Sequence, residues 1–191
     1  MAATKSTMLA LGTAAPDFSL PDTEGNLVSL QSFSEASGLL VAFICNHCPY
    51  VIHIRSELKK LGDDLEARGV KMVAISSNDV GKYGADSPAK MKEERAAAGY
   101  SFAYLYDESQ EVAKAYRAAC TPEFYLFDGD QRLVYRGQLD DSRPRNGKPV
   151  TGKDLRGAVD ALLAGEAISA EQQPGVGCNI KWKPGNEPDY S

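Results

Sequence analysis

Two cysteines separated by two residues, Cys45 and Cys48, are the side chains in this chain best suited to chemistry. An apolar run over residues 39–44 leads into them, and a segment with helical periodicity begins after Pro49. A thiolate is the nucleophile in thiol–disulfide exchange, and the N-terminus of a helix stabilises a nearby negative charge. Because two cysteines at this spacing can close a small disulfide loop, the pattern predicts a redox-active dithiol. We expect Cys45 to attack a substrate disulfide and Cys48 to resolve the mixed disulfide that results.

The same residues allow a second interpretation, a metal-binding module with Cys45, Cys48 and His47 as ligands. A structural zinc usually takes four ligands at similar local spacings. The remaining cysteines, Cys120 and Cys178, stand alone in the sequence. The spacing therefore favours redox chemistry, with neither a metal nor a cofactor, over a metal site.

Composition limits the class of protein. The chain has 191 residues, of which 43% are hydrophobic and 25% charged, which is typical of one soluble globular domain. A net charge of −5 argues against nucleic acid or an anionic membrane as the partner. No apolar run reaches about 18 residues, so no transmembrane helix is expected. The first ten residues lack the sustained apolar stretch of a secretory signal, and we expect a cytoplasmic location.

Strands and helices are expected to alternate around the two cysteines. Apolar runs predict strands over 39–44, 70–76 and 102–106, and a hairpin over 121–137. Helical periodicity and end signals predict helices over 49–68, 88–98, 107–116 and 153–163. Another hairpin is expected within 12–30. The strand–helix–strand order predicts parallel strands in an α/β domain over 12–164, with a loose leader over 1–11 and a C-terminal extension over 165–191.

Several motifs resemble the thioredoxin fold. Between Gly12 and Leu30 the pattern A-P-D-F-x-L-P-D-x-x-G-x-x-x-S-L is similar to the opening of the redoxin branch. That branch includes AhpC/TSA-type peroxiredoxins and ResA/TlpA-like thiol oxidoreductases. The C-N-H-C-P-Y motif at Cys45, T-P-E-F at Thr121 and G-C-N-I-K-W at Gly177 resemble a group of thioredoxin-like redoxins. The resemblance implies a central mixed β-sheet flanked by helices, with an N-terminal β-hairpin and an irregular C-terminal tail.

The resemblance also implies how His47 acts. Oxidising members of the fold carry a C-x-H-C motif, and an imidazolium there would tune the pKa of Cys45 by stabilising its thiolate. Stabilising the reduced form raises the reduction potential. We therefore expect a couple more oxidising than that of thioredoxin, whose potential is about −270 mV. The alternative is an exposed loop histidine without effect on the thiols.

Thr121 and Pro122 resemble the loop whose cis-proline faces the C-x-x-C motif. A cis bond there presents the backbone of Thr121 to an extended substrate, whereas an ordinary trans turn is the alternative. Glu123 follows directly, either as a proton acceptor near the dithiol or as a solvated residue at a strand edge.

The two isolated cysteines are candidates for auxiliary roles. Cys120 lies two residues before the proline and is expected either to approach the site or to be buried and inert. Cys178 would become a second resolving thiol if the tail folds over the site. Otherwise the tail is expected to pack on the surface through Trp182.

The chain also departs from its relatives. Leu39 and Val51 stand where thioredoxin and ResA-like proteins carry a buried acid, so proton transfer needs another group or water. Alignment of the peroxiredoxin pattern P-x-x-x-T/S-x-x-C on Cys48 puts Val41 at the proline and Cys45 at the hydroxyl. The hydroxyl that positions peroxide in that family is therefore absent. A lone thiolate can still form sulfenic acid, and an antioxidant thiol peroxidase remains the alternative.

Together these residues predict an enzyme, a thioredoxin-like thiol–disulfide oxidoreductase that acts on protein or small-molecule disulfides. Its partners would be a disulfide-bearing protein or small thiol substrate and an upstream dithiol reductant, with no nucleic acid and no membrane. The oligomeric state is left open, a homodimer included.

Overall fold

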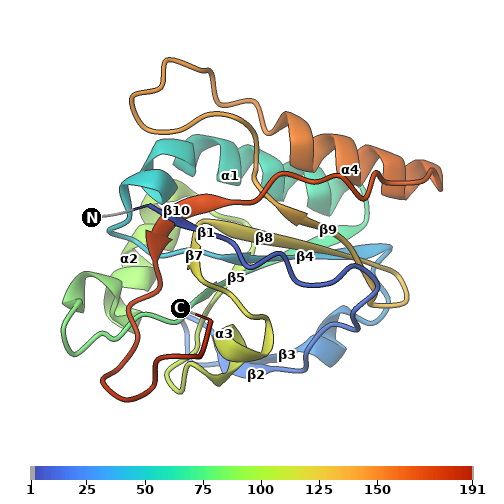
Figure 1. Cartoon of the computed structure of the whole chain (residues 1–191). Coiled ribbons are helices and arrows are strands. Elements are labelled where there is room, and N and C mark those ends of the chain that lie inside the picture. Colours follow the sequence, from blue (N-terminus) through green and yellow to red (C-terminus); the bar gives the residue numbers. More distant parts are fainter. Residues whose placement is uncertain (1–2, 191) are drawn as a thin grey trace.

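A computed structural model describes residues 3–190 (Figure 1). The strands are β1 (Thr4–Lys5), β2 (Ser19–Pro21), β3 (Leu27–Ser29), β4 (Gly38–Phe43), β5 (Val70–Ser76), β6 (Ala103–Tyr106), β7 (Cys120–Thr121), β8 (Glu123–Asp128), β9 (Leu133–Gly137) and β10 (Val176–Asn179). The α-helices are α1 (Pro49–Ala67), α2 (Pro88–Ala98), α3 (Glu111–Ala115) and α4 (Lys153–Ala164). This order confirms the expected mixed α/β fold.

The central sheet has five strands in the order β6-β5-β4-β8-β9. Strands β4, β5 and β6 are parallel, while β8 runs antiparallel to both β4 and β9. Every residue of β4 is buried, since strands pair with it on both sides and other elements cover both faces. The continuous apolar run of residues 39–44 is the pattern of such a fully buried strand.

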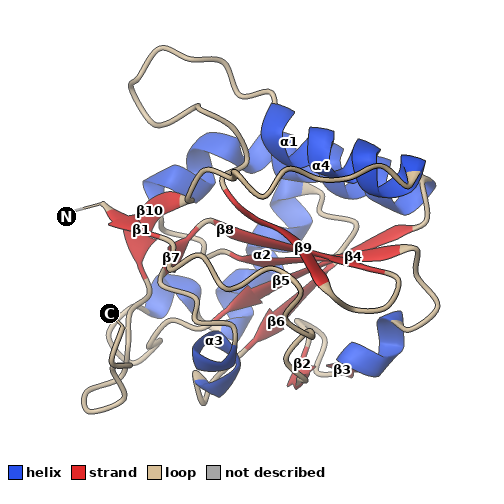
Figure 2. Ribbon diagram, turned by 45° about the vertical axis from the view of Figure 1, so that its right-hand side comes forward, coloured by secondary structure: helices blue, strands red, loops and turns tan. Residues whose placement is uncertain are grey.

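Two layers cover the sheet (Figure 2). Side chains of β4 alternate between them, because successive residues of a strand point to opposite faces. Leu40 and Ala42 belong to the core shared with α1, α2 and α4. Val41 and Phe43 belong to the core on the other face, under α3 and the β2–β3 hairpin. No helix among residues 3–190 combines the length and apolar character needed to cross a membrane.

Helix α1 begins with Pro49 at its first turn, where the missing N–H of proline costs no hydrogen bond. Its buried stripe matches the expected periodicity: Val51, Ile54, Leu58, Leu61 and Leu65. Cys48 is the N-cap residue of this helix. The end of β4 and the start of α1 therefore carry the two cysteines, as the sequence predicts.

Segments near both ends of the described chain form strands that the sequence pattern does not predict. Strand β1 pairs with β10, and β10 pairs with β7, which makes a second sheet of three short strands. The expectation of a loose leader is wrong at Thr4–Lys5, and that of an irregular tail is wrong at Val176–Asn179. These strands are short and contain few apolar residues, so hydrophobic periodicity gives no signal for them. Figure 1 shows β10 beside β1 and β7.

Candidate redox-active site

Cys45 and Cys48 lie between the end of β4 and the start of α1, and 1% and 0% of their surfaces are exposed. The peptide bond between Thr121 and Pro122 is cis, as expected from the resemblance. The pairing of β8 with β4 places this bond near the cysteines, because Glu123, which follows Pro122, is opposite Phe43 at the end of β4. Residues far apart in the sequence therefore face each other across a buried junction.

Three sulfur atoms gather around Thr121. The Cys45 Sγ lies 3.5 Å from the Thr121 hydroxyl oxygen, and the Cys48 Sγ lies 3.2 Å from the Thr121 carbonyl oxygen. The third sulfur belongs to Cys178 in β10, and its Sγ lies 2.8 Å from that of Cys48. We refer to Cys45, Cys48 and Cys178 as the three-sulfur cluster. The tail thus folds over the dithiol, the condition under which Cys178 was expected to matter.

The surroundings of the three-sulfur cluster favour a thiolate on Cys48 over one on Cys45 or Cys178. Hydrogen bonds to its sulfur from Cys178 and Cys45 hold the pKa of Cys48 well below its usual range. Its place at the N-terminus of α1 favours the same thiolate. Cys45 and Cys178 each share a hydrogen bond with Cys48. This bond raises the pKa of Cys45 and that of Cys178, and burial adds to the effect. This distribution differs from the expected one, in which the first cysteine of the motif carries the charge.

The imidazole of His47 is held by a carboxylate. His47 Nδ1 lies 2.6 Å from Asp86 Oδ2. The fully buried Asp86 also accepts hydrogen bonds from the Asn46 backbone N–H at 2.8 Å and from Asn78 Nδ2 at 2.7 Å. The His47 ring stacks on Tyr83, with 5.5 Å between centroids. His47 is thus a tethered, partly buried residue and not the exposed loop histidine of the alternative, while its expected effect on the thiols stays a prediction.

Asp86 is a site residue that the sequence reading misses. Its carboxylate contributes to the raised pKa of Cys45 because it opposes a second negative charge nearby. Ligand atoms of Cys45, His47 and Asp86 lie within 4.8 Å of one another, so the metal alternative would take Asp86 where the sequence suggested Cys48. No periodicity marks this aspartate, which ends a short 3-10 helix (Gly84–Asp86) 40 positions beyond Asn46. It is placed entirely by tertiary contact.

Comparison with known proteins adds to this geometry. The sequence pattern of the AhpC/TSA family matches residues 11–136, more than half of the chain. The chain belongs to the AhpC/TSA family. A candidate peroxiredoxin of Mycobacterium tuberculosis is 30% identical over 122 residues, which cover 64% of this chain and 73% of the relative.

Solved structures similar to this AhpC/TSA-family protein support the fold. A conserved protein from Geobacillus kaustophilus is 54% identical with a TM-score of 0.94, covering 96% of this chain and 98% of its own. The thioredoxin domain of a thiol-disulfide oxidoreductase from Bacteroides vulgatus has a TM-score of 0.63 at 21% identity, covering 81% and 99%. The second likeness concerns the fold alone, and it confirms the thioredoxin-like architecture.

In this AhpC/TSA-family protein Glu123 is a buried acid. Only 1% of its surface is exposed, so the solvated strand-edge alternative is wrong. Its Oε2 accepts hydrogen bonds from the backbone N–H groups of Ala119 and Cys120, at 2.9 and 3.2 Å. Burial raises the pKa of Glu123 to about 7. The residue supplies the chain with a buried carboxyl, although Leu39 and Val51 stand where thioredoxin and ResA-like proteins carry an acid.

Cys120 lies on the other face of β7 from the three-sulfur cluster. Its sulfur is 3.8 Å from Glu123 Oε2, and burial together with this carboxyl raises the pKa of Cys120 well above its usual range. In the β7–β10 pair Cys178 is opposite Thr121, whereas Asn179 is opposite Cys120. Because side chains alternate along a strand, Cys178 and Cys120 point to different faces. The structure thus favours the buried, inert interpretation of Cys120.

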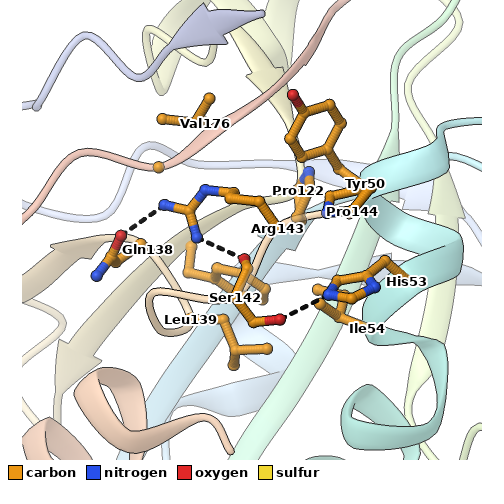
Figure 3. Close-up of a pocket in the computed structure, with 12 residues that line it drawn as sticks. Tyr50, His53, Ile54, Pro122, Gln138, Leu139, Ser142, Arg143, Pro144 and Val176 are labelled. Atoms are coloured by element: carbon orange, nitrogen blue, oxygen red, sulfur yellow. Dashed lines mark hydrogen bonds between the residues drawn. The ribbon is translucent and has the colours of Figure 1, made fainter. Parts of the chain in front are cut away.

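A small cavity lies beside Pro122, between α1 and the loop after β9 (Figure 3). Its lining includes Tyr50, Arg143 and Val176 of β10. Its volume is about 20 Å³, which holds about one water molecule. Gly175 and Val176, at the start of β10, form part of the wall of this cavity, so β10 covers this side of the site.

Proposed function

We propose that this protein is a thiol–disulfide oxidoreductase whose redox couple is Cys45 and Cys48. One observation carries the proposal: the two buried cysteines meet at the start of α1, in contact with Thr121 before cis-Pro122. Membership of the AhpC/TSA family and the thioredoxin-like fold support it. The shared hydrogen bond between the two thiols supports a reaction in which one sulfur assists the other.

The first half of the reaction uses Cys48 as a base. In the reduced protein the Cys45 thiol donates its hydrogen bond to the Cys48 thiolate. Cys48 takes this proton as the Cys45 sulfur attacks one sulfur of the substrate disulfide. A bond forms between Cys45 and that sulfur, the substrate S–S bond breaks, and the other substrate sulfur leaves as a thiolate.

The second half of the reaction forms the disulfide within the protein. The Cys48 sulfur attacks Cys45, the Cys45–Cys48 bond forms, and the bond from Cys45 to the substrate breaks. The proton from Cys48 and one from solvent end on the two released substrate sulfurs. Two electrons have passed from the dithiol to the substrate, and an external dithiol must restore the reduced protein. Cys48 then carries the proton of Cys45, a role for which this chain has no acid at positions 39 and 51.

A single-turnover experiment with glutathione disulfide tests this proposal, since a small disulfide suits a covered site. Reduced wild-type protein should lose two thiols and gain an internal disulfide, as seen by thiol titration and intact mass. Cys48→Ser should stop with glutathione attached to Cys45, and Cys45→Ser should form no such adduct. Cys120→Ser removes a buried sulfur outside the three-sulfur cluster and should behave like wild type. A Cys45→Ser variant as reactive as wild type would exclude the mechanism.

A thiol peroxidase is the second candidate function, and Thr121 favours it. The peroxiredoxin hydroxyl missing at position 45 has a counterpart in the Thr121 hydroxyl, 3.5 Å from the Cys45 sulfur. Hydrogen peroxide is small enough for a covered site, and a relative is a candidate peroxiredoxin. The Cys45 thiol would give up its proton and take one peroxide oxygen to become sulfenic acid, and that proton would leave with the other oxygen as water. Cys48 would then displace a second water to form the disulfide.

Peroxide consumption with dithiothreitol as electron donor tests this second function. A peroxidase should consume hydrogen peroxide, and dimedone should trap a sulfenic acid on Cys45 in Cys48→Ser. If glutathione disulfide oxidises the dithiol while peroxide leaves Cys45 untouched, the protein is an oxidoreductase without peroxidase activity.

A further inference from the structure

Strand β10 lies where an extended partner of the site would lie. It runs antiparallel to β7, with Cys178 opposite Thr121, the residue that precedes the cis-proline. Its other edge pairs with β1, where Thr4 is opposite Gly177. The chain therefore supplies its own strand to the backbone beside the dithiol.

Gly177 permits the close approach of β10 to β7. A Cβ atom at this position would lie 1.9 Å from the Thr121 carbonyl oxygen, a separation that no side chain can adopt. The next residue in this register is Cys178, whose side chain then points to the same face as that of Thr121. The glycine thus brings the sulfur of Cys178 to the dithiol.

Contacts beyond β10 hold the segment in this position. The backbone of Lys181 accepts a hydrogen bond from the Asp79 N–H at 2.7 Å and donates one to Asn78 Oδ1 at 2.8 Å. The buried side chain of Gln110 donates to the Lys181 carbonyl at 3.0 Å. These buried hydrogen bonds fix the chain three residues after Cys178, and the pairing of Gly177 with Thr4 fixes it one residue before.

We propose that β10 is a built-in redox partner of the site, in which Cys178 exchanges a disulfide bond with the Cys45–Cys48 pair. This inference rests on the proposed oxidoreductase function. The contact that carries it joins the Cys178 and Cys48 sulfurs, 2.8 Å apart.

The exchange needs no oxidant beyond the disulfide already formed. The Cys178 sulfur, as its thiolate, attacks Cys48 in the Cys45–Cys48 disulfide. The Cys48–Cys178 bond forms, the Cys45–Cys48 bond breaks, and Cys45 leaves as a thiolate that takes up the proton lost by Cys178. No electrons are gained or lost overall. The product keeps β10 linked to α1 and frees Cys45, so the external dithiol would act on the bond to the tail.

Disulfide mapping of the Cys45→Ser variant tests the exchange partner. Diamide removes two hydrogens from any pair of thiols in contact. We expect this variant to lose two hydrogens in intact mass and to yield a peptide joining Cys48 to Cys178. Cys45→Ser/Cys178→Ser should lose none, whereas Cys45→Ser/Cys120→Ser, the matched control, should form the same bond as the single variant.

The outcomes separate this inference from the proposed function. If Cys45→Ser keeps three free thiols, or pairs Cys48 with Cys120, while wild type forms the Cys45–Cys48 bond, the inference fails and the oxidoreductase remains. If wild type forms no bond between Cys45 and Cys48, the proposed couple fails. Should Cys45→Ser not fold, mapping of wild type decides, since oxidation to a mixture that includes Cys48–Cys178 is expected and its absence overturns the exchange.

Discussion

The two faces of strand β7 each bury a cysteine beside an acceptor, yet the two sulfurs differ in character. On one face Thr121 contacts the three-sulfur cluster, where hydrogen bonds from Cys178 and Cys45 lower the pKa of Cys48. On the other face the Cys120 thiol donates to the carboxyl of Glu123 and to the Pro122 carbonyl, and burial together with this carboxyl raises its pKa. Burial alone therefore does not make a cysteine inert. Neighbouring hydrogen-bond donors determine whether a buried cysteine ionises, because they stabilise the thiolate that burial disfavours.

Thiolate absorbance gives the largest expected contrast between the two faces. Reduced wild-type protein should show one thiolate near 240 nm at about pH 6, where an ordinary cysteine is protonated. Cys48→Ser should lose this whole signal, since Cys48 holds the charge. Cys120→Ser should keep it. A signal that survives in Cys48→Ser and disappears in Cys120→Ser would reverse the comparison.

Stability against pH tests the other face. The buried Glu123 has a folded pKa of about 7, above its unfolded value, so the folded state retains a proton that the unfolded state loses. The resulting stability is complete below about pH 4.5 and is lost as pH rises to about 7, by about 3 kcal/mol. Glu123→Gln keeps an oxygen acceptor and removes the titration.

Urea unfolding at the two ends of this range measures the effect. The free energy of unfolding of Glu123→Gln relative to wild type should rise by about 3 kcal/mol between pH 4.5 and pH 8. Equal pH dependence in the two proteins would mean that Glu123 does not titrate in this range.

The Gly177→Ala variant tests whether β10 shields the cysteines on one face of β7 and not Cys120 on the other. The added Cβ must displace β10 from the Thr121 carbonyl, at a cost of about 1–3 kcal/mol. Alkylation of Cys48 and Cys178 by iodoacetamide should then accelerate, while Cys120 stays protected. Gly157→Ala in α4 is the control, because no atom lies within 4 Å of its Cβ, and it should stabilise the protein by up to about 1 kcal/mol. Equal alkylation in both variants would show that β10 does not shield the cluster.

The smallest expected effect concerns Asp86. Its carboxylate raises the pKa of Cys45, so Asp86→Asn should lower that pKa by about one unit. The comparison is made in a Cys48→Ser background, where the neighbouring thiolate is absent. The rate of Cys45 alkylation against pH gives the value, and an unchanged or higher pKa would contradict the assigned role.

The elements that carry Cys45 and Cys48 could be predicted because burial of β4 and of one face of α1 leaves a periodic apolar pattern. Asp86 and the pairing of Cys178 with Thr121 could not. Asp86 is placed by hydrogen bonds from distant residues, and β10 is placed by its register with β7. Hydrogen bonds to side chains and the close approach of a glycine leave no hydrophobic period. The family resemblance supplied the cis-proline and drew attention to Cys178, but not their contact.

In both proposed reactions the redox chemistry of this protein passes through Cys48. Disulfide mapping of wild-type protein after diamide treatment tests it most directly, by identifying every linked pair of cysteine peptides. We expect Cys48 in every disulfide, joined to Cys45 or to Cys178, and Cys120 in none. Four free thiols after treatment, or a disulfide that contains Cys120, would contradict it.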